Sequence, residues 1–261
     1  MHPDWQWRVV ALAMMVGLAA AAPGRAAEEK ASEKKEADEK KADVQKEEHF
    51  EREIKMTITT NYLLYLPPGY GTQKKSWPLV LFLHGSGESG NDLSKVKFHG
   101  PPKQVAAGRK FPFILVSPQA PLSGWDLQTL NALIDDLIEK FNVDKDRIYL
   151  TGLSMGGYGT WSLASESPDR FAAIAPICGG GVPEDAQKLK DLPIWVFHGA
   201  KDDVVPLKSS EEMVDALRKL GSKKVKFTVY PDAGHDSWSA TYDNPEFYEW
   251  LLKQRRGEAQ P

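Results

Sequence analysis

One serine lies in a context typical of an activated nucleophile. Ser154 is the central residue of GLSMG, a G-x-S-x-G pattern between an expected strand over residues 147–152 and an expected helix over residues 155–166. The serine of such a strand–turn–helix occupies a strained turn, which flanking glycines permit, and its hydroxyl projects beside a helix N-terminus that favours negative charge. We therefore expect Ser154 to act as a nucleophile. The alternative is a glycine-rich turn without catalysis.

A serine hydroxyl needs a base, and the base needs an orienting acid. His235 lies in PDAGHDSW, between the last expected strand and the last expected helix, and Asp202 lies in HGAKDDVVP after the preceding strand. The order Ser154, Asp202, His235 is the order found in one class of hydrolytic triad. Asp203 is the rival acid, and a surface-loop histidine is the alternative interpretation of His235.

Hydrolysis through a serine also needs donors for a developing oxyanion. The backbone N–H of Met155, directly after the nucleophile, is one expected donor. The other is expected from the HGSGE loop that follows an early strand, where we favour the N–H of Ser86, with Gly87 as the alternative.

Other polar residues near these strand ends have simpler interpretations. His84 and His198 each precede a glycine, and we expect them to satisfy loop backbone groups. Glu88 and Asp92 are expected to fix their loop, because no second ligand cluster is spaced for a metal. Cys178, the only cysteine, follows an apolar strand and is expected to be a small buried residue, which excludes an intrachain disulfide.

The elements that must position these residues alternate along the chain. Apolar strand patterns occur at 78–84, 113–117, 147–152, 171–177, 194–198 and 225–230, helical patterns at 127–141, 155–166, 209–220 and 245–253, and a strand or hairpin pattern at 57–66. Alternation with near-continuous apolar strands predicts an α/β fold with a mostly parallel sheet and helices on both faces. Such sheets place their chemistry at the carboxyl ends of the strands.

Composition narrows the class of protein. The 261 residues carry 33 Lys and Arg against 36 Asp and Glu, a formal net charge of −3. No overall basic field is therefore present to bind a nucleic-acid backbone, and we expect no nucleic-acid partner.

The N-terminal region predicts export. Residues 1–27 contain an apolar run, 9–22, that is preceded by Arg8 and followed by small residues, which is typical of a signal peptide. The run is shorter than a bilayer span, although an uncleaved anchor is the alternative. Residues 28–49 hold nine acids and six lysines and are expected to form a charged disordered or helical spacer before a catalytic domain over 50–261. We expect a secreted or periplasmic protein without stable membrane insertion after cleavage.

At this point the chain resembles a known family. The segments HGSGESGND, DKDRIYLTGLSMGGYGTW, HGAKDDVVP and AGHDSW are similar to the α/β-hydrolase superfamily, in particular to secreted phospholipase/carboxylesterases, feruloyl and acetyl-xylan esterases and single-domain relatives of prolyl oligopeptidase. The resemblance covers about residues 55–255. It implies an acyl-enzyme mechanism with no metal or organic cofactor. No propeller precedes the hydrolase part, which argues against a gated oligopeptidase.

The expected substrate is a small-molecule or polysaccharide-linked ester. Only about 16 residues, 178–193, separate two strands where lipases of this fold often insert a lid, so we expect an open site without a large lid. Trp125 and Trp238 are candidates for lining the substrate pocket, with ordinary packing as the alternative. Two other functions stay open: a serine peptidase without a propeller, and a non-catalytic binding module on a hydrolase scaffold. The sequence does not give the oligomeric state.

Overall fold

Seven strands form one sheet in the computed structural model, which describes residues 30, 31, 33, 34, 47–53 and 55–257. The chain divides into two units, residues 1–55 and 56–261, and the sheet belongs to the second. The expected signal peptide, residues 1–27, and most of the expected spacer, residues 28–49, lie outside the described residues. Among the residues that are described, no helix has both the length and the apolar character needed to span a bilayer.

The strand order is β1-β3-β2-β4-β5-β6-β7, and every pairing is parallel except that of β1 with β3. The strands are β1 (Tyr62–Tyr65), β2 (Trp77–Leu83), β3 (Ile114–Pro118), β4 (Val143–Leu153), β5 (Ala173–Ile177), β6 (Ile194–Gly199) and β7 (Val225–Tyr230). This mostly parallel sheet confirms the predicted fold class.

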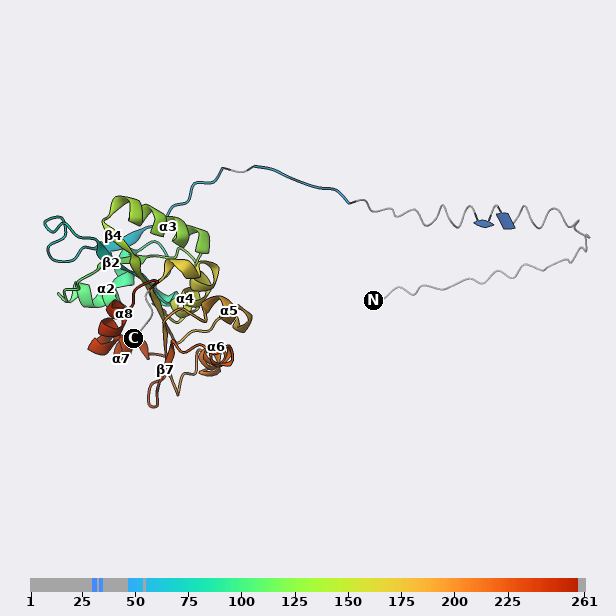
Figure 1. Ribbon diagram of the computed structural model, residues 1–261. Coiled ribbons are helices and arrows are strands. Elements are labelled where there is room, and N and C mark those ends of the chain that lie inside the picture. The colour runs from blue at the N-terminus through green and yellow to red at the C-terminus, as the bar shows by residue number, and fades with distance from the viewer. Residues whose placement is uncertain (1–29, 32, 35–46, 54, 258–261) are drawn as a thin grey trace, which may run out of the picture. The chain divides into compact units, whose positions relative to one another are not determined.

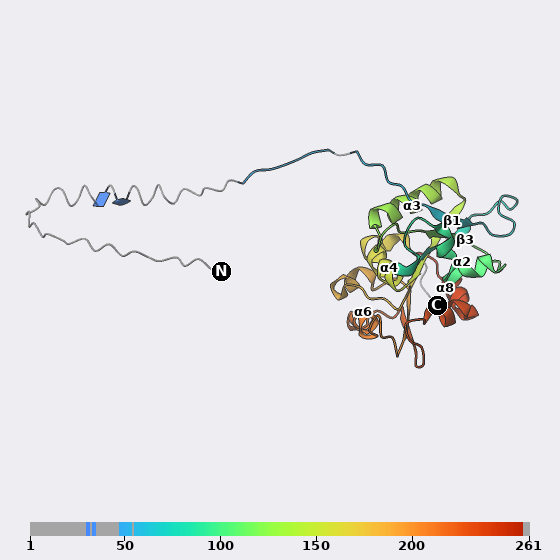
Figure 2. The same cartoon turned by 180° about the vertical axis from the view of Figure 1, so that it is seen from behind.

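Helices cover both faces of the sheet (Figure 1). One face is covered by α3 (Leu127–Lys140), α4 (Met155–Glu166), α5 (Ala186–Leu189) and α6 (Lys208–Lys219), the other by α2 (Gly100–Ala106), α7 (Trp238–Asp243) and α8 (Pro245–Lys253). The two groups also lie on opposite sides of the sheet when it is seen from behind (Figure 2). Strand β2 shows why: Leu79 and Leu81 join one buried cluster, whereas Val80 and Phe82 join the other. Because alternate side chains point to opposite faces, a fully apolar strand requires cover on both.

Short 3₁₀ helices complete the loops. They are η1 (Ser86–Glu88), η2 (Leu93–Lys97), η3 (Pro168–Arg170) and η4 (Pro183–Asp185). The segment 178–193 contains only η4 and α5, so it adds no large lid.

The first strand is shorter than the strand or hairpin expected over residues 57–66. Tyr62 pairs with Pro118, the last residue of β3, so residues before Tyr62 have no partner strand to continue along. The prolines at 67 and 68 end the strand on the other side because they lack an N–H donor. Helices α2 and α7 were not expected, since α2 begins with Gly-Pro-Pro, which is typical of a turn.

Candidate active site

The turn between β4 and α4 gives Ser154 a strained backbone. Its φ of 53° and ψ of −117° are unusual for a residue with a side chain, and its N–H donates to the carbonyl of Ile177 at 3.0 Å. The flanking glycines are required by space. An added Cβ would lie 2.4 Å from the Gly156 oxygen at Gly152, and 2.0 Å from the Leu83 oxygen at Gly156. Only glycine at both positions lets α4 approach the sheet this closely.

Three side chains from three strand ends meet beside this turn. His235 Nε2 lies 3.0 Å from Ser154 Oγ, and His235 Nδ1 lies 2.8 Å from Asp202 Oδ2. Ser154 follows β4, Asp202 follows β6 and His235 follows β7, so the parallel strands deliver all three to one edge. A carboxylate only accepts, so Nδ1–H donates to Asp202 and Nε2 is left to accept the serine proton. The arrangement fits a nucleophile, a base and an orienting acid.

Asp202 is held as an ionised group. Its Oδ1 accepts hydrogen bonds from the N–H groups of Val204 and Val205, at 2.9 and 2.8 Å, and its side chain is fully buried. Burial acts to raise the pKa of this carboxyl, but the hydrogen bonds from His235, Val205 and Val204 outweigh burial and hold the pKa below its usual value. The rival Asp203 is exposed and makes none of these contacts. The structure thus brings Asp202, not Asp203, to the imidazole.

The loop after β2 lies against the serine. At Gly85 an added Cβ would be 3.7 Å from Ser154 Cβ. His84 Nδ1 donates to the Gly85 carbonyl at 2.6 Å, and its Nε2 accepts from the N–H of Ala120 at 3.0 Å. The C=O and N–H of a trans peptide point in opposite directions, so this bond turns the Ser86 N–H away from the His84 ring.

Both buried histidines bind loop backbone, as their positions suggested. Burial lowers the pKa of His84, so its ring is held neutral between Gly85 and Ala120. His198 contacts the Val205 carbonyl at 2.9 Å and Ser210 Oγ at 2.7 Å.

The second expected oxyanion donor begins a helix. Met155 is the first residue of α4, where the backbone N–H has no intrahelical acceptor and is free to bind an anion. Its sulfur accepts the Gly124 N–H at 3.1 Å, which ties the 123–125 loop to the elbow. The roles of Met155 and Ser86 as oxyanion donors stay predictions.

The two tryptophans lie in different surroundings. Trp238 is 9% exposed, and its ring stands edge-on to His235 with centroids 5.2 Å apart, so it packs behind the imidazole. Trp125 stacks near His84, at 4.7 Å between ring centroids, and also lines a hollow of about 310 Å³ with Leu122 and Thr129. The position of Trp125 suits a substrate contact better than that of Trp238, although both contacts stay predictions.

A buried acid and a distant histidine join the site. Glu88 Oε2 accepts the Gly85 N–H at 2.9 Å, and its Oε1 lies 3.6 Å from His99 Nε2. The sequence indicated a loop-fixing role for Glu88 but gave no signal for His99, whose other partner, Trp238, is 139 residues away.

Among the described residues, one group could offer three ligand atoms to a metal ion. Cys178, Asp202 and His235 place such atoms within 4.8 Å of one another. Burial raises the pKa of the Cys178 thiol to about 12, so the thiolate that a metal prefers is not formed near neutral pH. His235 Nδ1 and Asp202 Oδ2 already bind each other. The donor set therefore fits a proton relay better than a metal centre.

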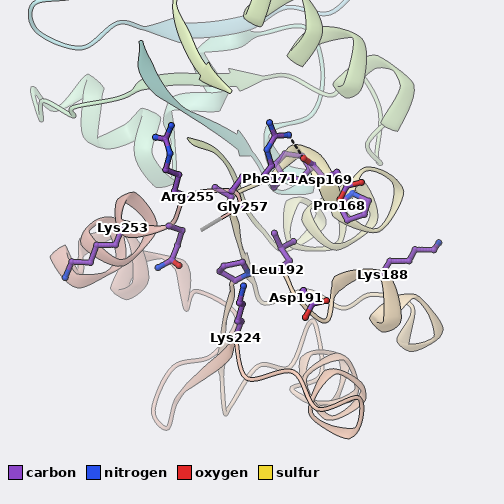
Figure 3. Close-up of a pocket in the computed structure, with 14 residues that line it drawn as sticks. Pro168, Asp169, Phe171, Lys188, Asp191, Leu192, Lys224, Lys253, Arg255 and Gly257 are labelled. Carbon is purple, nitrogen blue, oxygen red and sulfur yellow. Dashed lines mark hydrogen bonds between the residues drawn. The ribbon is translucent and has the colours of Figure 1, made fainter. Parts of the chain in front are cut away.

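A hollow of about 280 Å³ lies at the other end of the strands (Figure 3). It is lined by residues just before β5, β6 and β7 and by the chain after α8, and Lys188, Lys224, Lys253, Arg255 and Arg256 make it basic. The triad follows the carboxyl ends of its strands, so this hollow is on the opposite edge of the sheet.

The matches to known proteins agree in kind. A profile of the phospholipase/carboxylesterase family matches residues 125–244. The bifunctional acetylxylan esterase/xylanase XynS20E of Neocallimastix patriciarum is 31% identical over 149 residues, which is 54% of this chain and 22% of the relative. Probable feruloyl esterase C of Aspergillus terreus is 26% identical over 160 residues, 59% of each protein. The crystal structure of a thermostable esterase has a TM-score of 0.67 and 37% identity, covering 75% of this chain and 59% of that one. The chain thus spans about a fifth to three fifths of these relatives.

Proposed function

The chain belongs to the α/β-hydrolase superfamily and is related to its esterases, and from this premise we propose that it hydrolyses carboxylic esters through a covalent acyl-enzyme on Ser154. The hydrogen-bonded series Ser154, His235, Asp202 is the single observation that carries the proposal. It places a hydroxyl, a base and an ionised acid in working order at the start of a helix.

The proposed reaction has two halves. Ser154 Oγ attacks the ester carbonyl carbon while its proton moves to His235 Nε2, and the carbonyl electron pair moves onto oxygen. Collapse of this tetrahedral species breaks the bond to the alcohol, which leaves with the proton from His235. Water then attacks the acyl-enzyme, again giving its proton to His235, and releases the carboxylic acid and free Ser154. Asp202 holds the imidazole and stabilises its positive charge, and the N–H groups of Ser86 and Met155 receive the oxyanion.

We propose acyl esters on plant cell-wall polysaccharides as the substrate class. Two relatives bear the names acetylxylan esterase and feruloyl esterase. The short segment 178–193 leaves the site without a large lid, which suits acyl groups that protrude from a polymer better than long chains in a lipid droplet. Export through the N-terminal signal peptide is part of this proposal, since such polymers are outside the cell.

A substrate panel tests the activity. The purified protein is assayed with acetyl, butyryl, long-chain and feruloyl esters and with aminoacyl-nitroanilides, and Ser154→Ala is the matched control. We expect turnover of short-chain or feruloyl esters that is lost in the variant. Preferential cleavage of the anilides would favour a peptidase instead, and equal turnover of long and short chains would contradict the open-site argument. A protein inactive on the whole panel would leave only a binding role.

A further inference from the structure

The buried Glu88 makes contacts that a loop-fixing residue does not need. Its side chain is 7% exposed although it follows Ser86 and Gly87, which are exposed. Burial is the main cause that raises the pKa of its carboxyl, partly opposed by His99 and by the Gly85 N–H. Burying a carboxyl has a free-energy cost unless its oxygens have partners. Both oxygens of Glu88 have one.

The first partner is the peptide before the expected oxyanion donor. Glu88 Oε2 accepts the Gly85 N–H, and His84 holds the Gly85 carbonyl. The two peptide units on either side of Gly85 are therefore both fixed by side chains. The Ser86 N–H belongs to the second unit, so its direction depends on the pair of contacts.

The second partner leads across the site. Glu88 Oε1 faces His99 Nε2 at 3.6 Å, and His99 Nδ1 accepts the indole N–H of Trp238 at 3.3 Å. Trp238 then packs edge-on against His235. Since Nδ1 accepts, a neutral His99 carries its proton on Nε2 and points it at Glu88. The loop of the oxyanion donor and the loop of the base are linked through these four side chains.

We propose that Glu88 is a positioning residue, which fixes the Ser86 N–H for the transition state and, through His99 and Trp238, holds that donor in register with His235. The inference rests on the proposed function. Removing the carboxylate leaves the buried Gly85 N–H without an acceptor, so the loop must move or admit water. An oxyanion forms only in the transition state, so the loss should affect kcat and not KM.

Three variants test the proposal on an ester that the wild type hydrolyses. Glu88→Leu should lower kcat roughly 10- to 100-fold with nearly unchanged KM, a smaller loss than the deletion of a whole oxyanion donor. Glu88→Gln keeps an oxygen for the Gly85 N–H and should stay within about threefold of the wild type. His99→Ala keeps that bond but breaks the link to Trp238, and should lower kcat by about three- to tenfold. Asp92→Ala is the matched control, because Asp92 is a carboxylate of the same loop that caps η2 through the Ser94 N–H and faces solvent.

A tetrahedral probe separates positioning from general damage. A trifluoromethyl ketone forms an oxyanion adduct when Ser154 Oγ adds to its carbonyl carbon and the serine proton moves to His235. Its inhibition constant should rise in Glu88→Leu by the factor lost from kcat/KM and stay unchanged in Asp92→Ala.

Unchanged kcat in Glu88→Leu or in His99→Ala would overturn the proposal, as would a Glu88→Gln protein as impaired as Glu88→Leu. Where Glu88→Leu does not fold, the Gln and His99 variants decide by the same criteria. A wild type without ester turnover and without labelling of Ser154 would instead mean that the proposed function itself has failed.

Discussion

The two edges of the sheet both gather charged residues, but in different ways. At the carboxyl edge, Asp202 is fully buried, and its oxygens accept from His235 and from two backbone N–H groups. At the amino edge, Arg255 and Arg256 form ion pairs with Asp144 and Asp146 that remain partly exposed to solvent.

The difference lies in what each network leaves available. The carboxyl-edge network ends at Ser154 Oγ, a hydroxyl that still has a proton to give. The ion pairs of the amino edge neutralise their members on the surface and direct no nucleophile or base into the hollow beside them. Burial and convergence, not charge density or the size of a hollow, therefore distinguish the reaction site.

The largest effect should come from the base. His235→Ala removes the only side chain that contacts both Ser154 and Asp202, so kcat should fall by about 10⁴-fold or more while the protein stays folded. Steady-state kinetics and circular dichroism check this. A loss below about tenfold would mean that the carboxyl edge is not the reaction site.

The next effect should separate two neighbouring acids. Asp202→Asn should lower kcat by about 10³-fold, because an amide cannot both stabilise the imidazolium and keep its tautomer. Asp203→Asn, on an exposed neighbour without these contacts, is the matched control and should change kcat by less than about threefold. The reverse ranking would show that the acid has been assigned to the wrong residue.

A pH effect on stability should follow from the same residue. The folded-state pKa of Asp202 is lowered, so its ionisation stabilises the fold at pH values above the ordinary carboxyl pKa, and this contribution is lost as pH falls through the folded value. Urea unfolding of the wild type should therefore weaken on acidification below about pH 4 more steeply than that of Asp202→Asn. Parallel slopes for the two proteins would contradict the assigned ionisation.

The smallest effect should be found at the opposite edge. Arg256→Ala removes contacts with Asp146 and the Asp169 carbonyl, and should lower the free energy of unfolding by about 0.5–1 kcal/mol. Ester turnover should change by less than about twofold, because no step of the reaction uses this edge. A larger loss of turnover in a folded protein would tie the basic hollow to catalysis.

The sequence predicted the local elements better than the contacts between them. Strong apolar patterns placed α4 at 155–166 and β7 at 225–230 as observed, because period and turn signals act over short range. The first strand was predicted too long, since its length depends on where β3 ends. Pairing at an edge is tertiary information that no local pattern contains.

The same distinction applies to the site. The G-x-S-x-G turn and the loop positions of Asp202 and His235 can be read from the chain, and the parallel topology explains why they converge. The contact of His99 with Glu88 and Trp238 could not be predicted, because α2 itself was missed and packing alone brings these residues together.

Covalent labelling of Ser154 is the most direct test of the central claim that a buried acid and an imidazole activate this hydroxyl. A fluorophosphonate probe should add one equivalent to the wild type, located on Ser154 by peptide mass mapping, and none to Ser154→Ala. Labelling at another residue, or an unlabelled wild type that is correctly folded, would contradict the account.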